Sequence, residues 1–180
     1  TFTVSGSELE ITSAGVLTFA TAPDYETKTS YTATVTASDG TNTVTQDITV
    51  NVTDANDPPT FTSNATFSAA ENQTAIGTVT ATDPEGDALS FTISGSDITI
   101  VSSSGLLEFA SAPDYESQTS YSATVTVSDG TNSVTQDITV NVTNVNDVAP
   151  EFTSDATFSA AENQTAIGTV TATDAEGDTV

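Results

Sequence analysis

The stretch Ser120–Val142 reads SYSATVTVSDGTNSVTQDITVNV, and its pattern decides the fold class. Apolar and polar residues alternate along Tyr121–Val127 and Val134–Val142, with Gln136 as the one polar residue on the apolar face. Because successive side chains of a strand point to opposite faces, a period of two predicts two strands with one wet face. The residues between them, Asp129–Asn132, are typical of a turn.

Working outward, turn-forming residues interrupt the preceding sequence at short intervals, as at Pro84–Asp87 and Ser94–Asp97. About seven short strands in a stretch of about 90 residues predict an all-β fold, a seven-stranded Greek-key immunoglobulin-like β-sandwich. We expect the strands at Phe67–Ala70, Gly77–Thr82, Leu89–Ile93, Ile98–Val101, Leu106–Phe109, Ser120–Ser128 and Val134–Val142.

The unit is repeated in tandem. Asp24-Tyr25-Glu26 recurs as Asp114-Tyr115-Glu116, a shift of 90 residues, and Ala70–Asp83 recurs from Ala161 to Asp174. We therefore expect the C-terminal two-thirds of a repeat at 1–58, a complete repeat at 59–148, and the N-terminal third of a following repeat at 149–180. Neither partial piece can bury a core by itself.

The presence of an incomplete repeat on each side of the complete one has two explanations. The chain is either a window on a longer tandem array, or the Ala149–Val180 tail of one chain completes the Thr1–Asp57 domain of the next in a head-to-tail polymer. The partners are then neighbouring identical repeats joined head to tail, in the same chain or in a homopolymer. Both explanations remain open from the residues alone.

The composition excludes several kinds of function. The 180 residues contain 25 Asp plus Glu, one Lys and no Arg, His or Cys, for a formal net charge of −24. A His- or Cys-based catalytic triad, a zinc site or a thiol centre cannot be built from this chain. With Lys28 as the one basic side chain, binding to nucleic acid or to an acidic membrane by charge is excluded. No apolar run approaches the ~20 residues of a membrane span, so no membrane insertion is expected. No Arg-bearing, apolar leader stands at the start of the chain, so we expect any targeting segment to lie outside this sequence.

The acidic residues collect where strands end. If the strands run alternately up and down, the acids after the first, fifth and seventh strands meet at one pole, and those after the second and sixth meet at the other. Crowded carboxylates repel one another unless a cation lies between them. Ca²⁺ is the natural counter-charge, because it is a hard ion that takes about 6–8 oxygen ligands. The simpler interpretation is that these loops are acidic and solvated.

Three motifs together resemble the cadherin family in its bacterial tandem form. They are the linker Asp54–Pro59 (DANDPP), the triplet Asp114–Glu116 (DYE), and Ala81–Asp87 (ATDPEGD). The resemblance covers essentially the whole chain. It implies that bound calcium ions stiffen the joint between one sandwich and the next.

The resemblance also implies a ligand set. In the first joint it comprises Asp24, Glu26, Asp54, Asn56, Asp57, Asp83, Glu85 and Asp129. In the second it comprises Glu71, Asp114, Glu116, Asn146, Asp147, Asp174 and Glu176. Asp39 and Glu162 would serve joints beyond these two, and Asp87 and Asp178 are not firm positions of the family. Asn144 stands where Asp54 has its carboxylate, so the second joint has one charge fewer there.

We therefore expect a calcium-rigidified extracellular repeat that builds a cell-surface filament or the stalk of an adhesin. The alternative is a carbohydrate- or protein-binding β-sandwich module attached to a secreted protein. An enzyme is not expected, because the paired acids repeat in every unit at a joint, which suits a scaffold better than a single active cleft.

Overall fold

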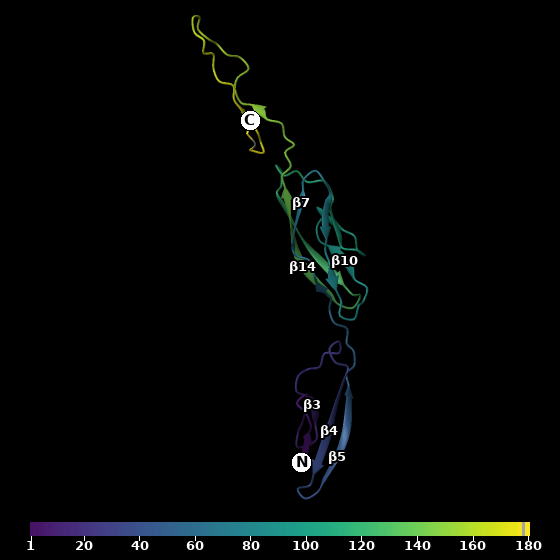
Figure 1. Cartoon of the computed structure of the whole chain (residues 1–180). Helices are drawn as coiled ribbons and strands as arrows, with labels where there is room; N and C mark the ends of the chain where they lie inside the picture. Colours follow the sequence, from purple (N-terminus) through teal and green to yellow (C-terminus); the bar gives the residue numbers. More distant parts are fainter. Residues whose placement is uncertain (178) are drawn as a thin grey trace. The chain divides into compact units, whose positions relative to one another are not determined.

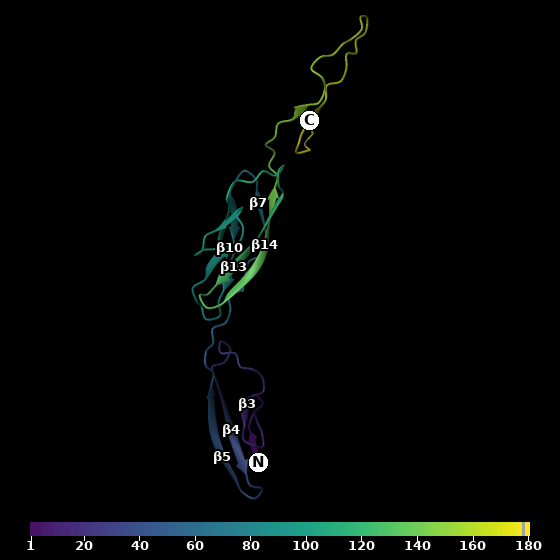
Figure 2. The same ribbon diagram turned by 180° about the vertical axis from the view of Figure 1, so that it is seen from behind.

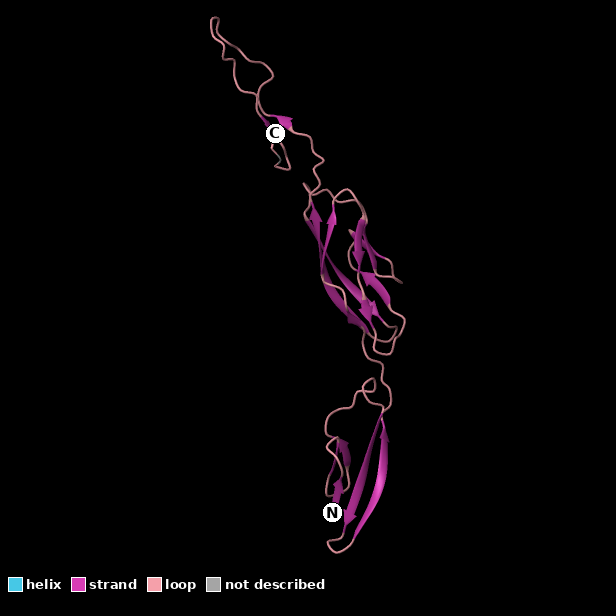
Figure 3. Ribbon diagram, in the orientation of Figure 1, coloured by secondary structure: helices cyan, strands magenta, loops and turns pink. Residues whose placement is uncertain are grey.

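A computed structural model describes residues 1–177 and 179–180, and Figure 3 shows strands and loops in them. These residues contain no helix that is long and apolar enough to cross a membrane. Contacts between Cα atoms divide the chain into two compact units. One unit is Thr1–Asp57 together with Pro84–Asp87, and the other is Pro58–Asp83 together with Ala88–Val180.

The second unit contains a two-layer sandwich, whose labelled strands can be followed in Figures 1 and 2. Its four-stranded sheet has the order β10 (Ser90–Ile93), β13 (Ser120–Ser128), β14 (Ser133–Thr143) and β7 (Thr66–Ala70). Its three-stranded sheet has the order β11 (Ile98–Ile100), β12 (Leu106–Phe109) and β8 (Ala75–Thr78). The fold is all-β and immunoglobulin-like, as the alternating pattern predicted.

The register explains the alternation. β13 and β14 pair antiparallel over their whole length, with Tyr121 opposite Val140 and Ser122 opposite Thr139. The apolar side chains point inward, and Val125, Val127 and Val140 are fully buried. β7 pairs parallel with β14, so the first and last strands of the sandwich end at the same pole. This parallel pairing confirms the direction that we inferred by alternating the strands.

The core lies between the two sheets. Val79, Leu107 and Ile138 pack there with the buried valines, and each such side chain contributes about 1.5–3 kcal/mol relative to full exposure. The rings of Phe109 and Tyr121 meet edge to face, with their centroids 5.1 Å apart. The equivalent pair of the first unit, Phe19 and Tyr31, has the same geometry with centroids 5.0 Å apart. Edge-to-face geometry suits the quadrupoles of two aromatic rings.

The strand predicted over Gly77–Thr82 is divided in the structure. β8 ends at Thr78 and pairs with β12, whereas β9 (Ala81–Thr82) pairs with β6 (Thr60–Phe61), a strand that the sequence pattern did not predict. Between them the fully buried Val79 donates its N–H to the carbonyl of Gly105 at 2.9 Å. The chain changes partner at Val79 because its side chain fills the core.

The first unit has a smaller core. One sheet has the order β1 (Phe2–Val4), β4 (Ser30–Ser38) and β5 (Thr43–Asn51), and β2 (Leu9–Ile11) pairs with β3 (Leu17–Phe19). Leu9, 4% exposed, is the one buried apolar side chain among residues 1–57. Within the described residues no strand pairs with the outer edge of β5.

Residues 149–180 carry two short paired strands, β15 (Glu151–Phe152) and β16 (Ala172–Thr173). The segment Thr157–Ala161 repeats the sequence of β7, TFSAA, but forms no strand. Phe152, Ile167 and Val170 are 78%, 67% and 61% exposed.

Candidate metal centres

The first acidic cluster lies within the first unit. It is formed by Glu26 in the loop after β3, Asp54 after the end of β5, and Glu85 from the segment Pro84–Asp87. One carboxylate oxygen of each lies within 4.8 Å of the others. The backbone N–H of Asp57 donates a hydrogen bond to Glu85 Oε2 at 3.3 Å.

The second cluster lies within the second unit and contains four carboxylates. Glu71 follows β7, Glu116 follows β12, Asp147 follows β14, and Glu176 follows β16. One carboxylate oxygen of each lies within 4.8 Å of the others. Three of these acids follow strands that end at one pole, as the alternation of the strands predicted.

Glu71 is the buried member of this cluster, with 3% of its surface exposed. Its Oε2 accepts the N–H of Tyr115 at 2.7 Å, and its Oε1 accepts the N–H of Val145 at 2.7 Å. The carboxylate therefore ties together the loop after β12 and the segment after β14. The amide of Asn72, whose φ is +62°, donates to Asp147 Oδ2.

One kind of hydrogen bond occurs in each of the two clusters. The N–H of Asp147 donates to Glu176 Oε1 at 2.8 Å, just as the N–H of Asp57 donates to Glu85 in the first unit. The other oxygen of Glu176, Oε2, is buried without a hydrogen-bond partner among the described residues. Burying a carboxylate oxygen without a donor is unfavourable, and a bound cation would supply the missing interaction.

The aspartates of the DYE triplets shape the loops that carry two of the glutamates. Asp114 accepts the N–H of Glu116 at 3.0 Å and the hydroxyl of Ser117 at 2.9 Å. In the other triplet Asp24 accepts the hydroxyl of Thr27 at 2.9 Å. The hydroxyls of Ser117 and Thr27 lower the pKa of Asp114 and of Asp24, so both carboxylates stay charged.

The glutamates of the same loops behave in the opposite way. Loss of hydration, the charge of Glu71, the hydrogen bond with Asp114 and the charge of Glu176 raise the pKa of Glu116. The N–H of Glu26 lowers the pKa of its own carboxyl, but loss of hydration, the hydrogen bond with Asp24 and the charges of Glu85 and Asp54 raise it by more. Like charges thus oppose one another in both clusters.

The one basic side chain of the sequence does not relieve this repulsion. Lys28 Nζ contacts the two carboxylate oxygens of Glu8 at 2.6 and 2.7 Å and lies 4.3 Å from the centre of the Tyr31 ring. Both clusters offer oxygen donors alone, which are the ligands that Ca²⁺ takes. The residues present therefore fit a hard divalent cation.

The remaining candidate ligands lie around or away from the clusters. Asp174 accepts the N–H of Glu176 at 2.9 Å, and the amide of Asn56 donates to the carbonyl of Asp57 at 3.2 Å. Asp39 and Asp129 each hold a turn by accepting two N–H groups of the residues that follow. Asp83 is half-buried, while Asn146 and Glu162 are exposed, and neither Asp83 nor Glu162 belongs to either cluster. Asp178 lies outside the described residues.

Two contributors were missed from the sequence. The first is the set of backbone N–H groups at Asp57, Tyr115, Val145 and Asp147, which carry no sequence signal of their own. The second is Asn72, which stands beside Glu71 and recurs as Asn163, whose φ of 65° is also positive. That recurrence was the signal that could have identified it.

Comparisons with known proteins agree with this geometry. Residues 56–143 match the model of the Bacterial Ig domain. The chain is 33% identical over 177 residues to Cadherin EGF LAG seven-pass G-type receptor 1 of Mus musculus, covering 89% of this chain and 6% of the receptor. It is 40% identical over 125 residues to Chitinase A of Pseudoalteromonas piscicida, covering 68% of this chain and 15% of that protein. The chain thus spans a small part of either relative.

A solved structure gives the same fold. The chain superposes on "Protocadherin Gamma B2 extracellular cadherin domains 3-6" with a TM-score of 0.67 and 24% identity, covering 97% of this chain and 50% of that one.

Proposed function

Because the chain is built from cadherin-like extracellular repeats, we propose that it is a calcium-rigidified structural and adhesive segment of a cell-surface filament or an adhesin stalk. The observation that carries this proposal is the four-carboxylate cluster of Glu71, Glu116, Asp147 and Glu176, which contains no basic side chain. The equivalent cluster at Glu26, Asp54 and Glu85 supports it, because the arrangement recurs with the repeat.

The acids have different roles in this proposal. The clustered glutamates and aspartates contribute oxygens directly, and Asp24 and Asp114 supply further oxygens while they hold the DYE loops in shape. Asn56, Asp57, Asn146 and Asp174 complete the two sites from the linker and from the following repeat. Calcium supplies the positive charge that the sequence lacks. Asp39, Asp83, Asp129 and Glu162 are proposed ligands of the same kind.

The setting of these sites follows from their chemistry. Calcium sites of extracellular modules bind weakly, with dissociation constants on the order of 0.1–1 mM, and we expect the same range here. We therefore place the chain outside the cell, with neighbouring identical repeats as its partners. A bacterial source is supported by the match to the Bacterial Ig domain.

The test is a calcium titration followed by thermal unfolding. About 5 mM Ca²⁺, well above the expected dissociation constant, should raise the unfolding temperature by several degrees relative to chelator. Glu116→Gln should reduce this rise, whereas Glu108→Gln, the same change at an exposed residue of β12 outside the cluster, should leave it intact. Equal unfolding temperatures of the parent chain in calcium and in chelator would show that the proposal is wrong.

The similarity to Chitinase A supports a second candidate function, a β-sandwich module that binds carbohydrate within a secreted enzyme. This alternative predicts that the purified chain is retained on chitin and released by soluble chitin oligosaccharides. The stalk proposal predicts that the chain passes through a chitin column with or without calcium.

A further inference from the structure

Asn72 connects two segments of the second unit that are far from it in the sequence. Its backbone N–H donates to the carbonyl of Pro113, just before the triplet Asp114–Glu116, at 3.0 Å. Its side-chain amide donates to Asp147 Oδ2, in the linker that follows β14. The preceding residue, Glu71, accepts one N–H from the same loop and one from the same linker. Residues 71 and 72 therefore join the loop to the linker.

The backbone of Asn72 has a conformation that few residue types adopt easily. Its φ is +62°, in the left-handed region, which costs asparagine less than most residues other than glycine. The turn comes two residues after the end of β7, so a regular strand fixes its position. Asparagine here combines a tolerated backbone conformation with a side-chain donor, and glycine would supply only the first.

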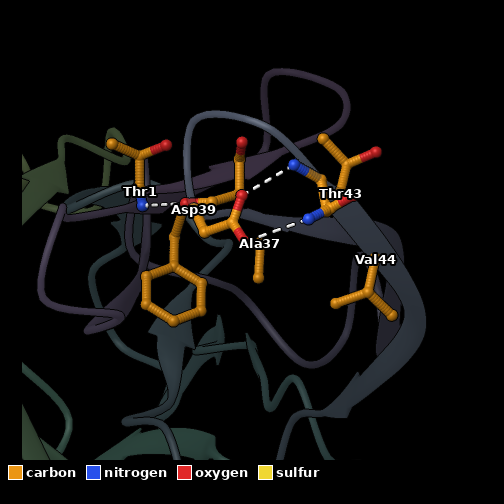
Figure 4. Close-up of a pocket in the computed structure, with 8 residues that line it drawn as sticks. Thr1, Ala37, Asp39, Thr43 and Val44 are labelled. Carbon is orange, nitrogen blue, oxygen red and sulfur yellow. Dashed lines mark hydrogen bonds between the residues drawn. The ribbon is translucent and has the colours of Figure 1, made fainter.

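Another asparagine–aspartate contact of the chain is local by comparison. The side-chain amide of Asn42 donates to Asp39 Oδ2 at 3.3 Å, and both residues belong to the turn between β4 and β5 (Figure 4). Asp39 Oδ1 also accepts the N–H of Asn42 at 2.6 Å, so these contacts close a single turn. The contact of Asn72 with Asp147 spans 75 residues instead and reaches a member of the four-carboxylate cluster.

This donor matters because the other members of the cluster repel Asp147. Glu71, Glu116 and Glu176 each bring a carboxylate oxygen within 4.8 Å of the others. Like charges at such distances oppose one another, whereas an N–H donor carries a partial positive charge and binds a carboxylate more strongly than a neutral acceptor. Without the amide of Asn72, repulsion would move the carboxylate of Asp147 toward water.

We propose that Asn72 is a positioning residue for the cation site, which holds the carboxylate of Asp147 in the cluster before the cation binds. The inference rests on the proposed function for the identity of the cation, but the hydrogen bond itself requires no cation. A carboxylate has about four lone-pair sites on two oxygens, so accepting from Asn72 leaves sites for Ca²⁺. Hydrogen-bond partners of this kind orient a ligand, and losing one lowers metal affinity by about 10- to 100-fold.

The test compares two variants of the 180-residue chain. Asn72→Gly removes the amide and keeps the left-handed turn, because glycine adopts positive φ readily. Asn163→Gly is the matched control, since Asn163 has a φ of 65° and follows Glu162, which belongs to neither cluster. Both changes increase the freedom of the unfolded chain equally, so a difference between the variants reports the contact with Asp147. The unfolding temperature in chelator checks that each variant is folded.

The first measurement is amide hydrogen exchange in chelator, followed by NMR. We expect the N–H groups of Val145 and Asp147 to exchange at least about fivefold faster in Asn72→Gly than in the parent chain, because the linker opens more often. Asn163→Gly should leave both rates unchanged. Equal rates in the parent and Asn72→Gly chains would overturn the proposal, whether or not the chain binds calcium.

The second measurement is a Ca²⁺ titration followed on the amide signal of Glu116. Asn72→Gly should lower the affinity about tenfold or more, whereas Asn163→Gly should keep the affinity of the parent chain. A parent chain whose signals do not respond to Ca²⁺ would contradict the proposed function instead, and the exchange rates in chelator would still decide the role of Asn72.

A double-mutant cycle with Asp147→Ala separates positioning from a general structural effect. Once the carboxylate of Asp147 is absent, Asn72→Gly should change the affinity by less than about twofold, because the two changes remove the same contact. A loss of affinity of equal size with and without Asp147 would mean that Asn72 acts through another contact, and the proposal would be wrong.

Discussion

At the scale of single residues, Glu71 differs from the other acids because it is both buried and fully engaged. Its two oxygens accept the N–H groups of Tyr115 and Val145, each at 2.7 Å. A buried N–H without an acceptor costs about 1–3 kcal/mol.

Glu71→Ala should therefore lower the free energy of unfolding by about 1–3 kcal/mol even without calcium, since the N–H groups of Tyr115 and of Val145, which is 41% exposed, lose their acceptor. Denaturant unfolding in chelator measures this. Glu108→Ala, at an exposed position, should change the same quantity by less than about 0.5 kcal/mol. If the two variants were equally stable, the Glu71 contacts would carry no stabilising energy.

The pH dependence also belongs to single residues. The pKa of Glu116 is raised by loss of hydration and by the charges of Glu71 and Glu176. Its ionised form therefore opposes folding, and this penalty is relieved as the pH falls through its raised pKa. The pKa of Asp114 is lowered, so its stabilising contribution is present at neutral pH and is lost as the pH falls through that lowered value.

Calcium binding requires ionised carboxylates, so protons compete with the cation. Because the pKa of Glu116 is raised, we expect calcium affinity to begin falling at a higher pH than an ordinary glutamate would cause. Isothermal titration calorimetry between pH 7 and about pH 5 measures this fall. Glu116→Gln should weaken binding at pH 7 and flatten the dependence. An affinity that is constant over this range would contradict the prediction.

At the scale of elements, the division between β8 and β9 depends on a close backbone approach. Gly105 has φ of +70°, and a Cβ added to it would lie 2.1 Å from the carbonyl oxygen of Val79. Gly95 has φ of +86°, but nothing lies within 4 Å of its Cβ position. The two glycines therefore separate the effect of contact from the effect of backbone conformation.

Gly105→Ala should destabilise the second unit by more than about 3 kcal/mol, because β12 and Val79 must move apart. Gly95→Ala should cost about 1–2 kcal/mol, the strain of a left-handed conformation alone. Thermal or denaturant unfolding of both variants checks the difference. Equal losses would mean that the contact with Val79 is relieved without strain.

At the scale of the whole molecule, repulsion among the acidic side chains is the main feature that affects stability. The 25 acidic side chains are offset by one lysine, which is already paired with Glu8, and this leaves a net charge of −24. Repulsion of this kind destabilises a compact state and is weakened by salt.

In chelator, raising NaCl from about 0.02 to about 0.5 M should therefore raise the unfolding temperature by several degrees. Calcium at millimolar concentration should stabilise the chain further in high salt. Salt screens the attraction between an ion and carboxylates a few ångströms away less than it screens the repulsion between distant charges. Measured stability that does not depend on salt would contradict this account. Loss of the calcium effect at high salt would mean that the ion acts by general screening.

Much of the fold was predictable from local pattern. The alternation over Ser120–Val142 predicted β13 and β14 to within one residue at each end, since an exposed serine or threonine face and an apolar face are visible in sequence. The clusters were predictable in outline, because strand direction alternates and the acids stand at strand ends. The three expected spans of the repeats, 1–58, 59–148 and 149–180, remain a prediction.

The sequence by itself determined the strand pattern, the repeat and the excess of negative charge, because these depend on residue order and composition. Tertiary structure decided which acids meet. Glu71, Glu116, Asp147 and Glu176 come from four separate segments, and their distances depend on how β7, β12 and β14 pack. It also decided that Val79 interrupts a continuous pattern, because a buried side chain and a hydrogen bond to Gly105 outweigh the local preference for one long strand.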